Sequence, residues 1–204
     1  MAWINTIALS EASGKLQKLY QRVAGPDGQI DNILKAHSLR PHTLTGHMTL
    51  YKNVLHHADN TLPKWYLESV GVYVSLINQC EYCVVHHKAG LCRLIGDDRG
   101  NAIVAALESD EWPSSEESRF AAGIQYASKL SRSPGKMRED DLAPLRTAGF
   151  DDGAILELNQ VIAYFNYANR TVLGLGVSFA GEVLGLSPSD ESDEENWGHQ
   201  KPVE

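Results

Sequence analysis

The sequence predicts an all-α protein, and three observations lead to this prediction. Apolar residues recur at spacings of three and four through most of the 204 residues, as on one face of an α-helix. Stretches in which polar and apolar residues alternate, which are typical of half-buried strands, are scarce. Proline, glycine and polar capping residues separate the periodic stretches at distances that suit ordinary helices. We therefore expect one helical domain, of about eight to nine helices, over residues 1–186.

The expected helices follow one another along most of the chain. Their ranges are Ser10–Val23, Asp31–Ala36, His42–His57, Leu62–Ile77, Glu81–Ile95, Asp98–Leu107, Ser115–Leu130, Glu139–Ala148 and Asp151–Leu184. Asn60 and Thr61 offer a polar N-cap for the fourth helix, and Pro63 then lies in its first turn. Ser114 and Ser115 offer hydroxyl caps for the seventh helix.

The last expected helix, Asp151–Leu184, is apolar on nearly all of its sides. Its apolar residues are Ile155, Leu158, Ile162, Phe165, Val172 and Leu175 on one side, and Val161, Tyr164, Leu173 and Phe179 on the others. Such a helix lies at the centre of a domain or at a subunit interface, and Gly174 and Gly176 could break it. Four polar residues either pair with groups on packed helices or shape a pocket or a subunit contact; they are Asn159, Asn166, Asn169 and Arg170.

Charge is distributed unevenly along the chain. The formal net charge is −8, and residues 187–204 hold six acids and one base, which leaves about −3 on the rest. This acidic tail has little apolar content, so we expect it to be disordered. The rest of the chain has no cluster of lysine and arginine, which argues against a nucleic acid as the partner.

The sequence contains no stretch typical of targeting or membrane insertion. The first dozen residues lack the basic start and apolar run of a signal peptide, and nowhere do 18 uncharged apolar residues follow one another. We therefore expect a cytoplasmic protein without a membrane partner. Three cysteines do not suggest a disulfide-stapled secreted scaffold, and a close pair of them in a reducing compartment indicates catalysis, redox chemistry or metal binding.

The stretch NQCEYCVVHHKAGL, residues 78–91, holds the most informative residues. Cys83 follows Cys80 by three positions and His87 follows Cys83 by four, so all three share one face of a helix that begins near Cys80. A helix N-terminus and a nearby imidazole both lower the pKa of a thiol, and the thiolate is the reactive form. Two cysteines at this spacing can also close a disulfide. Thiol redox chemistry is therefore favoured over a purely structural role.

Other interpretations of the cysteine pair fit less well. A c-type haem site requires histidine directly after the second cysteine, where Val84 stands. A structural zinc site draws a second ligand pair from a remote segment, and the remaining candidates are Cys92, His56 and His57. A thioredoxin-like motif belongs to a βαβ unit. We interpret Cys92 as a buried structural thiol, and His56 and His57 as residues of a helix C-terminus.

Four residues together resemble the signature of a known family. They are Glu68, Cys80, Cys83 and His87, and their spacing is similar to the Glu-x11-Cys-x2-Cys-x3-His signature of AhpD-like alkylhydroperoxidases, in the carboxymuconolactone decarboxylase superfamily. LPKWYLESVGVYVSLINQCEYCVVHHKAGL, within the core motif region 62–95, resembles the core repeat of that family. LRTAGFDDGAILELNQVIAYFNYANRTVLGLGV resembles the C-terminal part of its peroxidase-related branch. The resemblance covers most of residues 40–180.

The resemblance implies a thiol-dependent peroxidase that needs no haem, metal or other cofactor. Glu68 and His87 would deprotonate a cysteine that attacks an organic hydroperoxide or hydrogen peroxide. Cys83 would attack and Cys80 would resolve, although the helix dipole favours ionisation of Cys80. An external dithiol, for example on a lipoyl-bearing protein, would reduce the disulfide, and the chains would assemble as trimers or hexamers. Tyr82 stands where the well-studied relative has a histidine, so no proton relay is implied there.

Two other functions stay open. A lyase that acts on a small lactone, as in carboxymuconolactone decarboxylases, would need an acid/base pair rather than two cysteines. A non-enzymatic dithiol sensor or zinc-binding module would use the cysteines without turnover. The role of His86 is open too, because its side chain projects about 100° away from that of His87; it can face the active site, another subunit or solvent.

Overall fold

The computed structural model describes residues 2–25, 27–186 and 197–198, and within these ranges the protein consists of helices, turns and loops. The α-helices are α1 (Gly14–Val23), α2 (Asn32–Ala36), α3 (Pro41–Leu55), α4 (Lys64–Ile77), α5 (Glu81–Ile95), α6 (Asp97–Glu108), α7 (Arg119–Arg132), α8 (Ala143–Thr147) and α9 (Asp152–Leu175). Short 3-10 helices are found at Leu9–Glu11, Pro134–Lys136 and Glu139–Leu142. The expected all-α fold is confirmed.

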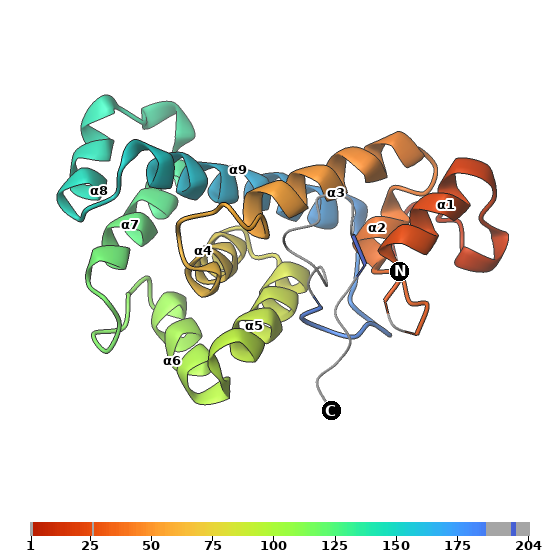
Figure 1. Cartoon of the computed structure of the whole chain (residues 1–204), viewed down its shortest axis with the longest axis horizontal. Helices are drawn as coiled ribbons and strands as arrows, with labels where there is room; N and C mark the ends of the chain where they lie inside the picture. Colours follow the sequence, from red (N-terminus) through yellow and green to blue (C-terminus); the bar gives the residue numbers. More distant parts are fainter. Residues whose placement is uncertain (1, 26, 187–196, 199–204) are drawn as a thin grey trace.

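The helices are arranged around α4. In Figure 1, α9 and α3 run along one long edge of the molecule, α7 and α8 lie at one end, and α1 and α2 lie at the other. α4 contacts α3, α5, α6, α7 and α9. Every residue from Tyr66 to Ser75 of α4 is buried, which makes it the most enclosed of these helices. This central helix carries Glu68, and the next helix, α5, begins directly after Cys80.

α9 has one buried and one exposed side. Leu158, Ile162 and Phe165 are fully buried, whereas Leu156 is 60% exposed and Tyr167 and Leu173 are also exposed. Of these three exposed residues, Tyr167 still contacts the His47 ring of α3, with centroids 5.9 Å apart. The sequence allowed this helix to lie at the centre of the domain, but the central helix is α4.

Several expected helix boundaries differ from those of the structure. α9 ends at Leu175, so the break that Gly176 could cause is confirmed and the continuation to Leu184 is wrong; Gly176 adopts a left-handed conformation (φ +60°) that terminates the helix. The expected helix Glu139–Ala148 is a 3-10 turn followed by the short α8, because Pro144 lacks the N–H that a helix interior needs. α1 begins at Gly14, after a separate 3-10 turn.

The expected N-caps are also wrong at two helices. α7 begins at Arg119, and no side chain caps it, so Ser114 and Ser115 do not perform that role. α4 begins after Pro63, again without a side-chain cap. Instead, Thr61 donates both its backbone N–H and its hydroxyl to the carboxylate of Glu157 on α9. This long-range contact holds the entry to α4 against α9.

Gly71 allows α4 and α9 to approach closely. A Cβ atom at this position would lie 2.2 Å from Cζ of Phe165, which is far inside van der Waals contact. The Phe165 ring in turn meets the His87 imidazole edge to face, with centroids 4.5 Å apart. The absence of a side chain at Gly71 thus decides where the ring beside His87 lies.

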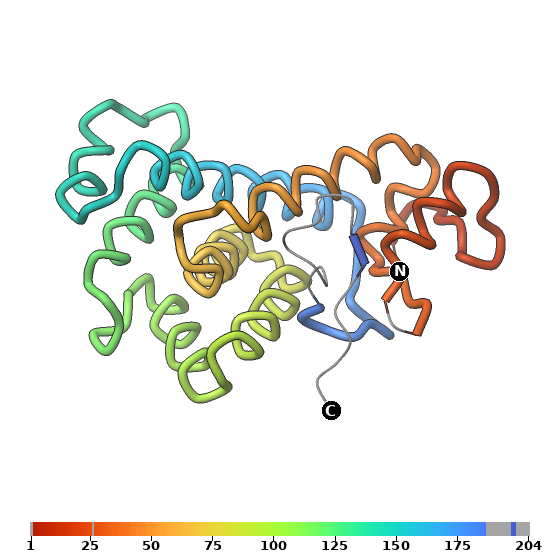
Figure 2. Tube along the Cα trace, in the orientation of Figure 1, coloured from red at the N-terminus to blue at the C-terminus, as the bar shows by residue number. Residues whose placement is uncertain are grey.

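The chain beyond α9 turns back toward α5 and the N-terminal helices. The tube in Figure 2 shows this segment passing between them. Of the predicted disordered tail, residues 187–196 and 199–204 lie outside the described residues. Trp197 is described, and it is 4% exposed, with the Arg22 guanidinium 3.6 Å above its ring. This residue of the tail therefore packs against α1.

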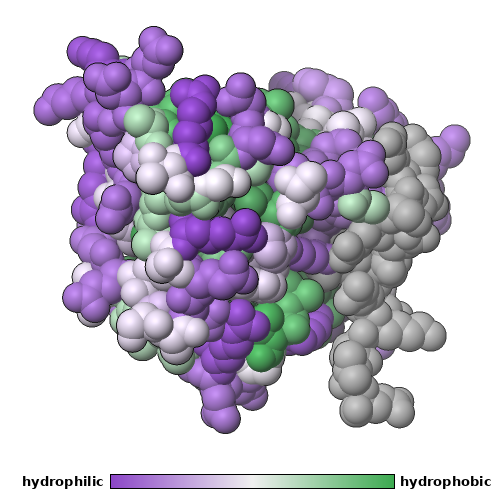
Figure 3. All heavy atoms as spheres, turned by 60° about the vertical axis from the view of Figure 1, so that its left-hand side comes forward, coloured by the Kyte–Doolittle hydropathy of each residue, from purple (hydrophilic) through white to green (hydrophobic). Residues whose placement is uncertain are grey.

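Polar side chains dominate the face drawn in Figure 3, with smaller hydrophobic areas between them. Among the described residues, no helix combines the length and apolar character needed to cross a membrane.

Candidate functional site

The turn between α4 and α5 places the two cysteines at a helix N-terminus. Gln79 adopts a left-handed conformation (φ 55°), which reverses the chain after α4. The N–H of Cys80 donates to the carbonyl of Ser75 at 2.9 Å, so the turn is closed by a backbone hydrogen bond. Cys80 is the residue that precedes the first turn of α5, and Cys83 lies within that turn.

Both thiols are buried, Cys80 fully and Cys83 to 3% exposure, and both are free. Hydrogen bonding to the Cys83 side chain lowers the pKa of Cys80, and the backbone N–H of Cys83 and the amide of Asn169 act in the same direction. The Cys80 side chain and burial together raise the pKa of Cys83 well above its usual range. The first negative charge of the pair therefore rests mainly on Cys80, and Cys83 keeps its proton.

A buried carboxylate and an imidazole form the second part of the site. Oε2 of Glu68 lies 2.7 Å from Nδ1 of His87, and Glu68 is only 3% exposed. Glu68 comes from α4 and His87 from α5, one turn beyond Cys83. A carboxylate that holds one ring nitrogen fixes the orientation of the imidazole and leaves the other nitrogen for proton transfer.

These groups meet in one cavity of about 270 Å³. Cys83, Glu68 and His87 line it, whereas Cys80 lies behind Cys83 in the small apolar cluster that also contains Val172 and Val177. The sulfur that faces the cavity is thus the one with the raised pKa. It requires a base to become a nucleophile, and the imidazole beside Glu68 lines the same space.

Asn169 connects the thiols to the central helices. Its amide donates to Oγ of Ser75 at 3.0 Å, its carbonyl oxygen accepts from Asn78 at 3.0 Å, and it interacts with both cysteines. Asn159 and Asn166 pair instead with Tyr126 and Ser131 on α7. The sequence left two roles open for these asparagines. Asn159 and Asn166, which contact α7, pair with groups on a packed helix, and Asn169 also shapes the surroundings of the thiols.

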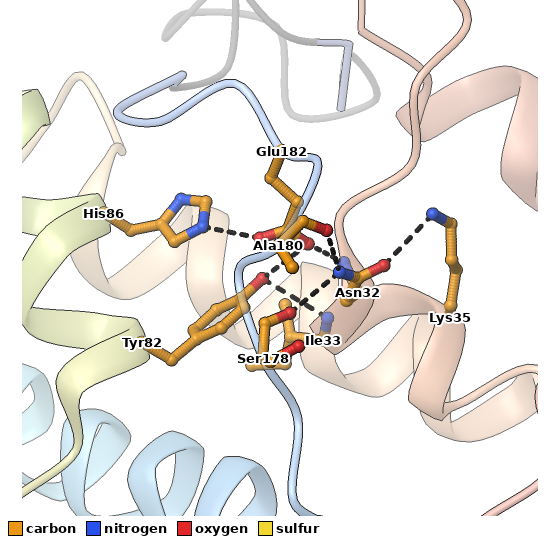
Figure 4. Close-up of polar contacts among 8 residues, drawn as sticks. All are labelled: Asn32, Ile33, Lys35, Tyr82, His86, Ser178, Ala180 and Glu182. Carbon is orange, nitrogen blue, oxygen red and sulfur yellow. Dashed lines mark hydrogen bonds and ion pairs between the residues drawn. The ribbon is translucent and has the colours of Figure 1, made fainter. Parts of the chain in front are cut away.

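A second carboxylate, Glu182, belongs to the site although the sequence did not single it out. It lies in the segment beyond α9, and its Oε2 is 2.8 Å from Nε2 of His86 (Figure 4). The hydroxyl of Tyr82 donates to the same carboxylate at 3.2 Å, and the backbone N–H of Asn32 donates to it as well. Glu182 is the single charged residue of the stretch 171–186, which is the signal that could have indicated it.

The contacts of Glu182 give Tyr82 and His86 defined places. Tyr82 stacks on the His86 ring, with centroids 4.6 Å apart, and its oxygen accepts the N–H of Ile33 at 3.3 Å. Further along, the Arg93 guanidinium donates to the carbonyl of Gly185 at 2.7 Å. The segment 177–186 is therefore attached along α5, and Gly185 and Leu186 complete the wall of the cavity.

The remaining candidates of the sequence lie around this centre. His56 is fully enclosed, and its Nε2 lies 4.0 Å from Oε1 of Glu68, so it belongs to the site's surroundings as well as to the end of α3. Cys92 is half-buried rather than buried as predicted, and its Sγ lies close to Gly100 of α6. In the part of the chain that the structure describes, no group of three or more His, Cys, Asp or Glu side chains is placed to hold a metal ion.

Solved structures match this fold, whereas no model of a protein family and no curated protein matches the sequence. A peroxidase-related protein with an alkylhydroperoxidase AhpD core, from Ralstonia eutropha, superposes with a TM-score of 0.75 at 21% identity, over 88% of this chain and 93% of that one. A peroxidase-related protein from Silicibacter sp. gives 0.73 at 24% identity, over 89% and 95%. The debrominase Bmp8 in complex with 2,3,4-tribromopyrrole gives 0.69 at 16% identity, over 87% and 91%. The resemblance suggested by the Glu, Cys, Cys, His spacing therefore holds for the fold, and this chain has the helical fold of AhpD-like, peroxidase-related proteins.

Proposed function

We propose that the protein is a thiol-dependent peroxidase that reduces an organic hydroperoxide or hydrogen peroxide. The observation that carries the proposal is the meeting of Cys83, Glu68 and His87 in one cavity, with the Cys80 thiol in contact with Cys83. A nucleophile, a base held by a carboxylate and a second sulfur are the three groups that a dithiol peroxidase needs.

In the proposed cycle, His87 donates its Nδ1–H to Glu68 and accepts the proton of Cys83 at Nε2. The Cys83 thiolate attacks one oxygen of the peroxide, the O–O bond breaks, and the leaving oxygen takes the proton from His87 to form an alcohol or water. Cys83 is then a sulfenic acid. Cys80 attacks its sulfur, a disulfide forms and water leaves. An external dithiol supplies the two electrons that restore both thiols.

The reductant and a second copy of the chain are the partners of this proposal. Both cysteines are buried, so the dithiol must be one that can enter the cavity at Cys83, as a lipoyl group on a flexible arm could. Self-association as a trimer or hexamer would cover Leu156, Tyr167 and Leu173, the exposed apolar residues of α9.

A second reaction of the same thiol is also open to test, because one structural neighbour is a debrominase in complex with 2,3,4-tribromopyrrole. The rings of His47, Tyr51 and Tyr164 line the cavity beside Cys83, and such a lining suits a small aromatic ring. Incubation of the protein with 2,3,4-tribromopyrrole and an excess of dithiol would release bromide if the chain acts in this way.

The first experiment measures free thiols after cumene hydroperoxide is added to the reduced protein, and then peroxide consumption with dihydrolipoamide. We expect rapid loss of two thiols per chain followed by sustained turnover. Cys83→Ser should abolish turnover with the helical content unchanged, and Cys92→Ser, the matched control, should retain it. Turnover in Cys83→Ser would refute the assignment. Loss of two thiols without turnover would instead indicate a dithiol sensor.

A further inference from the structure

Two tyrosines face the reactive thiol from outside the motif. Tyr51 comes from α3 and Tyr164 from α9, and their ring centroids lie 5.7 Å apart. Both line the cavity together with Cys83 and Glu68. The phenol groups are therefore held by two helices that do not carry the cysteines.

The hydroxyls of Tyr51 and Tyr164 differ from those of the tyrosines in the core. The hydroxyl of Tyr66 donates to the carbonyl of Phe120 at 3.0 Å, and that of Tyr73 donates to Asp110 at 2.8 Å. Tyr20, Tyr82 and Tyr126 have partners as well. By contrast, the hydroxyls of Tyr51 and Tyr164 make no hydrogen bond to any residue that the structure describes. Neither oxygen is among the fully buried side-chain atoms that lack a partner, so both are accessible from the cavity that their residues line, where a ligand oxygen can accept a hydrogen bond from them.

The surroundings keep both hydroxyls protonated. Burial raises the pKa of Tyr51 well above its usual range, and the charges of Glu68 and Asp31 add to the effect. Burial likewise raises the pKa of Tyr164, with contributions from Tyr51 and Cys83. Each group can therefore donate a hydrogen bond at neutral pH.

We propose that the hydroxyls of Tyr51 and Tyr164 form a pair of donors that binds the leaving oxygen of an organic hydroperoxide while Cys83 attacks the other oxygen. This assignment rests on the proposed peroxidase function. The walls beside the pair include Leu34, Met48 and Ala168, which would hold a compact apolar group on that oxygen. The preferred substrates are therefore organic hydroperoxides rather than hydrogen peroxide.

The donor pair changes the chemistry of one step only. As the Cys83 sulfur bonds to one oxygen and the O–O bond breaks, negative charge develops on the other oxygen. Donors aimed at that position stabilise the charge in a site that excludes water. The oxygen then takes the proton that His87 received from Cys83, so an alcohol leaves, the sulfur has become a sulfenic acid, and the tyrosines keep their protons.

The test compares Tyr51→Phe and Tyr164→Phe with Tyr167→Phe, a control on the exposed side of α9. Each substitution removes one oxygen and keeps the ring. Reduced protein is mixed with cumene hydroperoxide or with peracetic acid, and thiol loss is followed in a single turnover. Alkylation of Cys83 by iodoacetamide, identified by mass spectrometry, is measured in parallel because it reports on the thiolate without an O–O bond.

We expect each cavity variant to react with cumene hydroperoxide about tenfold to a hundredfold more slowly than wild type. With peracetic acid, whose leaving carboxylate is a weaker base, the loss should be smaller, and alkylation should be nearly unchanged. Tyr167→Phe should match wild type throughout. If one cavity variant fails to fold, judged by circular dichroism, the other carries the test.

Each of the other outcomes refutes either the donor pair or the peroxidase function. If wild type loses thiols and both cavity variants do so equally fast, the donor pair is refuted and the peroxidase proposal stands. If the variants slow alkylation as much as oxidation, the tyrosines act on the thiol and not on the leaving oxygen, which also refutes the pair. If wild type itself keeps its thiols, the peroxidase function fails and the donor assignment fails with it.

Discussion

Two neighbouring histidines of α5 each pair with a glutamate, yet the two pairs are built differently. His87 meets Glu68 of the central α4 at 2.7 Å, and His86 meets Glu182 of the segment beyond α9 at 2.8 Å. Glu182 also accepts hydrogen bonds from the Tyr82 hydroxyl and from the backbone N–H of Asn32. Its carboxylate therefore links the segment beyond α9 to α5 and α2. The same chemical pair can therefore serve a reaction or an attachment, and the other partners of the carboxylate distinguish the two.

The largest expected effect comes from Glu68→Gln. An amide cannot stabilise the imidazolium that forms when His87 takes the proton of Cys83. We expect the rate of thiol oxidation by cumene hydroperoxide to fall about a hundredfold or more, with the fold retained. The rate is measured by stopped-flow detection of thiol loss.

Glu182→Gln is the matched change at the other pair, and it should alter that rate only a few-fold. Equal losses in the two variants would break the comparison, because both histidines would then act in proton transfer.

A third histidine sharpens the comparison, because His47 has no carboxylate partner among the described residues and is 3% exposed. Burial, with a smaller effect of His37 beside it, lowers the pKa of His47 to about 3. The unfolded chain then binds the extra proton below about pH 6.5 while the folded chain does not, so stability falls as pH decreases from about 6.5 toward 3, by at most about 1.4 kcal/mol per pH unit.

Urea unfolding across this pH range checks the expectation for His47. In His47→Gln the dependence on pH should flatten, and in His42→Gln, an exposed position of the same helix, it should stay as in wild type. A dependence that His47→Gln leaves unchanged would mean that other groups are responsible for the loss of stability in acid.

A smaller effect is expected from Glu182→Gln on stability. The amide keeps one acceptor oxygen and loses the other, so one of the donors around it is left without a partner. We expect the free energy of unfolding to fall by about 1–3 kcal/mol, measured by urea denaturation. Glu81→Gln, on an exposed position of α5, is the control. No loss of stability in Glu182→Gln would contradict the attaching role of this pair.

The two cysteines also differ, because the pKa of Cys80 is lowered and that of Cys83 is raised. For this pair the predicted effect of a substitution is a change in thiol pKa. Removal of the Cys83 side chain in Cys83→Ala should raise the pKa of Cys80, since that side chain is the main cause of its lowering. Cys80→Ala should lower the pKa of Cys83 for the converse reason. Thiolate absorbance against pH measures both. Thiolate appearing at a lower pH in Cys83→Ala than in wild type would contradict the lowering of the Cys80 pKa by the Cys83 side chain.

Local patterns were sufficient to predict most helices. α5 lies at its expected bounds, Glu81–Ile95, and α2 begins one residue later than expected. These elements depend on periodicity within their own residues. The sequence left the end of α9 open between Gly176 and Leu184, because a helical pattern continues beyond Gly176, and whether that glycine stops the helix depends on how the following segment packs.

The site was accessible from the sequence only in part. The spacing of Glu68, Cys83 and His87 follows from two adjacent helices, so a signature could bring them together. Tyr164 reaches the cavity, and Glu182 reaches His86 in its wall, from segments far along the chain, and no periodic pattern records such a contact. Tyr51 and Tyr164 also looked like ordinary apolar residues of their helices, because a phenol without a partner can be recognised only once its neighbours are known.

The attachment of residues 177–186 along α5 has a consequence for the order in which the protein is made. The two thiols and their base leave the ribosome with α4 and α5, long before Gly185 and Leu186, which form one wall of the cavity. Until those last residues emerge, the cysteines lie in a half-built site that oxidants of any size can reach. In the proposed peroxidase, the cavity that would select a substrate is therefore complete only after residue 186 has been synthesised.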